Sequence, residues 1–237
     1  MKRSVKNNNK IDKINFFVLI FLRIVLIIAI PISVWENNFL FVFLSLLSFC
    51  LTFLPKIIER KYNIDIPSEL EIIIVLFIYA GIFLGGVRDF YYRYWWWDSL
   101  LHAISGLALG FIGFLILYTL YKTNKFKASP KTIVLFTFCF ALAMGTTWEI
   151  FEFGIDQIFG YNMQKARYLC SSQGYCDSRI GVIDSMVDLI LDAFGALVAS
   201  FAGYFYLSKG KSFLFQRFIK KFEKENKHLF NKKSFKY

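Results

Sequence analysis

Charge is scarce in this chain. Of its 237 residues, 19% are charged and 57% are hydrophobic. The apolar runs lack the alternation of β-barrel strands, and they are too long and too numerous for the core helices of a soluble protein. A membrane-spanning helix needs about 20 residues. These absences exclude a soluble domain and a β-barrel, and they predict an all-α polytopic membrane protein.

Acidic residues are outnumbered, 17 against 28 Lys and Arg, which gives a net charge of +11. An excess of this size raises the question of nucleic-acid binding. However, the basic residues flank the apolar runs and crowd both ends of the chain. That placement is typical of anchors facing anionic lipid, so we expect the lipid bilayer as a partner and no nucleic acid.

The first apolar run is not expected to be a cleavable signal sequence. The first apolar run, 14–34, is too long for the apolar segment of a signal peptide, and Pro31 and Ser33 make a poor cleavage site. Histidine is rare as well, with two in the chain. Because neither lies near Cys170 and Cys176, this pair predicts a possible disulfide or two free thiols rather than a zinc site.

Six transmembrane helices are predicted within a domain covering 14–207, between a basic N-terminus, 1–13, and a basic tail, 208–237. The predicted spans are 14–34, 39–54, 68–86, 98–121, 132–159 and 182–207. With the N-terminus inside, the inner segments hold 22 Lys and Arg and the outer segments 5. This asymmetry places both termini in the cytoplasm. Apolar residues at helical spacing among the lysines of the tail predict an amphipathic helix on the inner leaflet or, alternatively, a disordered tail.

Three of the predicted spans carry ionisable side chains at helical spacing. The sets are Asp98 and His102, then Glu149, Glu152 and Asp156, then Asp184, Asp188 and Asp192. Residues three or four apart share one face of a helix. With a rise of about 1.5 Å per residue, most of these groups lie roughly 6 to 15 Å below the outer surface. We therefore expect them to face one another in an acidic pocket near the outer leaflet.

So many carboxylates cannot all be ionised side by side without shared protons or a cation. Arg23 is the one basic residue inside a predicted span, and we expect it to pair with Asp192 or Glu149. A divalent metal ion of unknown identity, held by His102 and by carboxylates, would supply the remaining charge. The predicted ligands are His102, Glu152, Asp188 and Asp192.

Three classes of function remain open from the residues alone. An enzyme would use a metal-bound water, with Glu149 or Glu152 as general base, on a lipid headgroup or a lipid-linked substrate. A transporter would use the same carboxylates to carry protons or cations. A structural or regulatory protein would hold them in hydrogen-bonded pairs. In a purely structural interpretation, Asp98 and Asp184 only cap their helices.

The motifs resemble a known family. They are Trp97-Asp98-x3-His102-x3-Gly106, then Trp148-Glu149-x2-Glu152, then Asp184-x3-Asp188-x3-Asp192-x2-Gly195-Ala196, preceded by Arg88-Asp89-Phe90-Tyr91. Together, over about residues 65–207, they resemble the YjdF-like family of uncharacterised bacterial inner-membrane proteins, which implies a six-helix inner-membrane protein with no established reaction. A looser likeness is to the VanZ-like membrane proteins, from whose pattern Glu152 and Asp192 depart.

Overall fold

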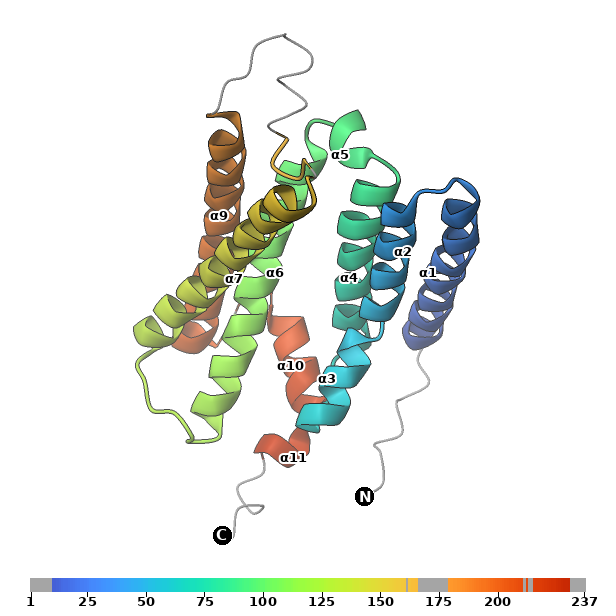
Figure 1. Ribbon diagram of the computed structural model, residues 1–237. Coiled ribbons are helices and arrows are strands. Elements are labelled where there is room, and N and C mark those ends of the chain that lie inside the picture. The colour runs from blue at the N-terminus through green and yellow to red at the C-terminus, as the bar shows by residue number, and fades with distance from the viewer. Residues whose placement is uncertain (1–9, 161, 166–178, 211, 213–214, 231–237) are drawn as a thin grey trace. The chain divides into compact units, whose positions relative to one another are not determined.

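All the regular elements that the structure describes are helices (Figure 1). The computed structural model describes residues 10–160, 162–165, 179–210, 212 and 215–230. The chain divides into two compact units, residues 1–97 with 217–237 and residues 98–216, and each is considered by itself. Cys170 and Cys176 lie outside the described residues, and so does their predicted disulfide.

Unit 1 contains the helices of the first part of the chain and the short helices of the C-terminal tail. They are α1 (Lys10–Trp35), α2 (Phe39–Leu51), α3 (Leu54–Tyr62), α4 (Ser68–Ile78), η1 (Tyr79–Val87), α5 (Phe90–Arg93), α10 (Gln216–Glu225) and α11 (Lys227–Phe230). Its core joins α1 to η1 through Leu26, Phe83 and Val87. The segment η1 is a π-helix, which continues α4 and which the apolar pattern does not distinguish from an α-helix.

The second predicted span continues further than expected. After a break at Thr52 and Phe53, the chain forms α3, with Pro55 in the first turn, where a missing N–H costs nothing. Arg23 of α1 holds this break, because its guanidinium donates to both the hydroxyl and the carbonyl oxygen of Thr52, each at 3.0 Å. The guanidinium also lies 4.2 Å from the centre of the Phe53 ring.

The hydrogen bonds of Arg23 are with Thr52, within unit 1. Because Asp192 and Glu149 belong to unit 2, the pairing expected for Arg23 stays a prediction. The helix α4 begins at Ser68, with Pro67 in the N-cap position.

Unit 2 consists of three long helices, α6 (Trp97–Lys122), α7 (Pro130–Phe159) and α9 (Ile180–Lys209). They lie side by side in Figure 1. Close approach of α6 and α9 requires glycine, since a Cβ at Gly106 would lie 2.1 Å from the carbonyl oxygen of Asp192. The starts of α6 and α9 and the end of α7 are thereby brought to one end of the unit.

Five helical segments of the described chain are long and apolar enough to cross a membrane: Lys13–Trp35, Phe39–Tyr62, Ser68–Val87, Trp97–Lys122 and Pro130–Ile158. They match the first five predicted spans. The helix α9 is not among them, so the sixth span and the orientation of the termini stay predictions. The amphipathic tail helix is present as α10.

Candidate functional site

Six of the eight ionisable residues predicted to face one another lie together in unit 2. Each is between 1% and 8% exposed: Asp98 and His102 from α6, Glu149 and Glu152 from α7, and Asp188 and Asp192 from α9. The residues lie near the start of α6, toward the end of α7 and near the start of α9, and these three helix ends are at the same end of unit 2. The helical spacing in the sequence therefore identified a real cluster.

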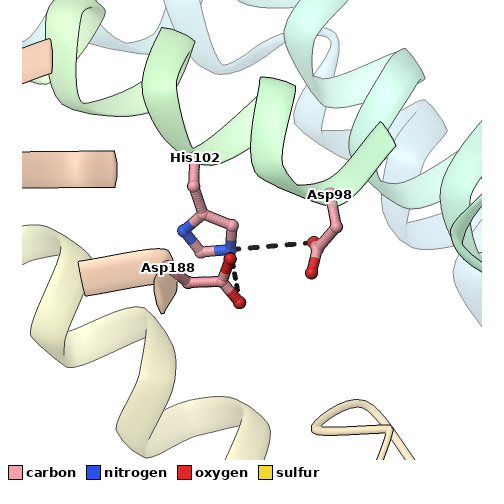
Figure 2. A group of neighbouring side chains, drawn as sticks. All are labelled: Asp98, His102 and Asp188. Carbon is pink, nitrogen blue, oxygen red and sulfur yellow. Dashed lines mark ion pairs between the residues drawn. The ribbon is translucent and has the colours of Figure 1, made fainter. Parts of the chain in front are cut away.

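His102 is the centre of this cluster. Its Nε2 atom lies 3.8 Å from each of three carboxylate oxygens, those of Asp98, Glu149 and Asp188. Figure 2 shows the Asp98 and Asp188 carboxylates pointing toward this nitrogen of the ring. A direct hydrogen bond would be about 2.7 to 3.2 Å long, so these atoms surround Nε2 without bonding to it.

The other ring nitrogen is held firmly. His102 Nδ1 lies 3.2 Å from Asp192 Oδ2, and the hydroxyl of Ser105 donates to the second oxygen of the same carboxylate. A carboxylate only accepts, so Nδ1 carries the hydrogen in this pair. In the neutral imidazole the lone pair is then on Nε2, facing the three carboxylates. Metal-binding histidines are oriented by such a carboxylate contact on the distal nitrogen.

Space for the Asp192 side chain comes from α7. A Cβ at Gly145 would lie 2.4 Å from Asp192 Oδ2, so a larger residue there would force the Asp192 carboxylate to move. Gly145 was not singled out from the sequence, because a helical glycine gives no local sign of what it faces.

Some buried oxygens in the cluster have no hydrogen-bond partner of ordinary geometry among the described residues, although the Ser185 hydroxyl lies close to Glu149. They are both carboxylate oxygens of Glu149 and Oδ2 of Asp188. An unpaired buried carboxylate oxygen is costly, and buried charges are paired or bind metals. Two of these three oxygens are among those that surround His102 Nε2.

The positions fit a metal ion. One ligand atom from each of Asp98, His102 and Asp188 lies within 4.8 Å of the others. Atoms that share one ion at 2.0 to 2.3 Å are about 3 to 4.5 Å apart. This group differs from the predicted ligand set. Asp192 contacts the opposite nitrogen of the ring, and Glu152 accepts a hydrogen bond of 2.8 Å from the Trp148 indole.

Lys165, in the segment that follows α7, reaches the cluster. Lys165 donates to Asp98 Oδ2, and it lies 3.1 Å from Asp184 Oδ1. Burial alone would lower the pKa of this ammonium, but the Asp98 and Asp184 carboxylates outweigh burial and raise the pKa above its ordinary value. Asp184 thus pairs with Lys165 and does not cap α9, whose N-cap position is Arg179.

The turn that carries Lys165 is fixed by Asp156. The two carboxylate oxygens of Asp156 accept from the backbone N–H groups of Met163 at 2.7 Å and Gln164 at 3.0 Å. Lys165 itself adopts a left-handed conformation, with φ of 56°. The third acidic residue of α7 therefore positions a loop and does not join the buried cluster.

Comparison with known proteins matches residues 17–209 to the sequence model of a family described as predicted membrane protein, DUF2238. A relative from Thermotoga maritima, described as an uncharacterized protein, is 27% identical over 144 residues, which cover 60% of this chain. The match spans 66% of that relative, just under two thirds. No solved structure matches. The family match is consistent with the resemblance to YjdF-like proteins and adds nothing to the VanZ-like likeness.

Proposed function

We propose that this chain, which belongs to the DUF2238 family of predicted membrane proteins, binds a divalent metal ion between Asp98, His102 and Asp188. Glu149 is the fourth ligand in this proposal, because its Oε1 atom faces the same ring nitrogen of His102. The observation that carries the proposal is the set of buried carboxylate oxygens of Glu149 and Asp188 that lack a hydrogen bond of ordinary geometry to any described residue while facing His102.

The types of donor atom in the cluster limit which metal ion would bind. One imidazole with several carboxylates suits zinc, manganese or iron, whereas magnesium and calcium prefer sites made of oxygen alone. We therefore propose a transition metal or zinc rather than magnesium or calcium.

The proposal places the site at the outer face of a bacterial inner membrane. It includes α9 as a sixth span with both termini in the cytoplasm, supported by the 22 to 5 distribution of basic residues along the sequence. The bacterial source of the matched relative agrees with this localisation. In that orientation a lipid headgroup or a lipid-linked molecule is the substrate class within reach, and hydrolysis is the reaction that a metal-bound water would serve.

The proposal also assigns different roles to the two glutamates of α7. Glu149 faces His102 as a ligand. Glu152, nearly one turn further along α7, instead accepts a hydrogen bond from the indole of Trp148. Glu152 is therefore the better candidate for a general base.

Metal analysis of the purified full chain tests the proposal. We expect about one zinc, manganese or iron per chain by elemental mass spectrometry after equilibration with each metal and removal of the excess. His102→Gln and Asp188→Asn should each weaken binding by more than about 100-fold, since each removes a direct ligand rather than an outer-shell partner.

Matched controls exist within the chain. His228→Gln alters the other histidine, which contacts the Asn63 carbonyl oxygen in unit 1, and Asp65→Asn alters an exposed carboxylate. Both should retain the metal. Failure of the wild-type chain to bind any of these metals, or equal loss in the control variants, would overturn the proposal.

A further inference from the structure

The exposed surface of the tail helix is uniformly basic. In α10 and the following turn, the exposed side chains are Arg217, Lys220, Lys224 and Lys227. The first three fall three and four residues apart, so they form one stripe along the helix. We call these three residues the basic stripe.

The opposite face of α10 is already used. Ile219 is fully buried and Phe222 is 7% exposed. The sequence suggested that such apolar residues would enter the bilayer, but in the structure the protein itself covers them. The side of α10 that remains for a partner is therefore the basic stripe.

Contacts within unit 1 fix the level of α10 relative to the candidate spans. Lys221 donates to Ser68 at 3.2 Å and also to Glu69, and these residues begin the span Ser68–Val87. Asn226, fully buried, accepts from the N–H of Asp65 and donates to its carbonyl oxygen, both at 2.7 Å. The tail helix is thus attached where the chain leaves one span at Tyr62 and enters the next at Ser68.

The ends of apolar spans lie at the headgroup layer of a bilayer. From its level and its charge, we infer that the basic stripe is a binding site for anionic phospholipid headgroups. Arg217 lies 3.7 Å from Glu69 of α4, so its charge is partly offset, whereas Glu225 lies 3.8 Å from Lys221, which is not part of the stripe. A basic residue near an anionic membrane surface contributes about a fivefold gain in binding.

The test uses the full chain in mild detergent, titrated with phosphatidylglycerol or phosphatidylcholine and followed by native mass spectrometry. The variant R217Q/K220Q/K224Q removes the stripe and keeps Lys221, which attaches the helix. We expect its affinity for phosphatidylglycerol to fall at least tenfold at low salt, with phosphatidylcholine binding unchanged and helix content by circular dichroism retained.

A matched variant, K125Q/K127Q/K131Q, removes the same charge from exposed positions in the loop after α6 and in the first turn of α7. It should keep most of the phosphatidylglycerol affinity. Equal loss in this control would mean that net charge alone matters, and the inference would be wrong. A stripe reserved for an acidic protein would leave lipid binding by the R217Q/K220Q/K224Q variant at the wild-type level, which would also overturn it. The metal site plays no part in either outcome.

Discussion

Replacement of Asp192 by asparagine separates the role of this residue from that of a direct ligand. The carboxylate lies 3.2 Å from His102 Nδ1, on the side of the ring opposite the proposed ligands, and it is 1% exposed. Asparagine keeps the size of the side chain, so the space left by Gly145 stays filled. It removes the charge that fixes the hydrogen on Nδ1 and increases the basicity of Nε2.

The expected loss follows from that position. Outer-shell partners of metal ligands are worth about 10- to 100-fold in affinity, or about 1.4 to 2.7 kcal/mol. Asp192→Asn should therefore weaken zinc or manganese binding by this amount, less than the loss expected for Asp188→Asn. The measurement is competition against a fluorescent chelator, with the full chain in nanodiscs.

A double-mutant cycle with Ser105 makes the test specific. Ser105 donates to Asp192, so Ser105→Ala should weaken binding severalfold in the wild-type chain and by much less once Asp192 is asparagine. Binding by Asp192→Asn at the wild-type level would refute the assignment of Asp192 as the residue that orients His102. A Ser105→Ala effect of the same size in both backgrounds would refute the coupling.

Two further predictions concern packing and the outer loop. Gly106→Ala should lower the thermal unfolding temperature by several degrees, because its Cβ would overlap the Asp192 carbonyl oxygen. Gly154→Ala, with nothing within 4 Å, should leave that temperature unchanged or raise it, since alanine is the better helix former. Equal losses in the two variants would contradict the packing argument. Lys165→Met should lose the Asp98 and Asp184 ion pairs. Since the pKa of Lys165 is raised on folding, its contribution is complete below the unfolded value of about 10.4 and is lost only as pH rises through the higher folded value. The stability difference between wild type and Lys165→Met, measured by thermal unfolding, should therefore stay constant from pH 7 to 10; a decline in that range would contradict the ion pairs.

Helical periodicity accounts for what could be predicted from the sequence. Spacings of three and four residues place side chains on one face, and the polar faces of three apolar helices meet because no other surroundings would accept them. The cluster of His102 with the carboxylates of α7 and α9 follows from this argument alone. The five candidate spans follow from the length of the apolar runs.

Periodicity does not determine which oxygen faces which ring nitrogen. Asp188 and Asp192 lie on the same stripe of α9, yet they contact opposite nitrogens of His102, because the ring lies between two successive turns. The predicted ligand set therefore included Asp192 and omitted Asp98. Helical spacing could have predicted a role for Ser105, since it follows His102 by three residues on the same helix face.

Lys165 had no such signal. It lies in an irregular loop, and only the folded chain shows that Asp156 fixes that loop and brings the ammonium to Asp98 and Asp184. Similarly, the break between α2 and α3 depends on Arg23, 29 residues earlier in the chain. Contacts between residues so distant in sequence are not encoded in local spacing.

The distribution of buried polar residues bears on the choice between binding and transport. Beyond Asp192 toward the other end of unit 2, the buried polar residues of the described chain are hydroxyl-bearing: Thr137, Ser200 and Ser212. Thr137 already donates to the carbonyl oxygen of Ile133 at 2.9 Å within its own helix. A cation that crossed the bilayer through this unit would need further carboxylates or carbonyl groups along its path. Within the described part of unit 2, the buried carboxylates and the buried imidazole lie at one end only, and this is the reason that we propose ion binding rather than transport.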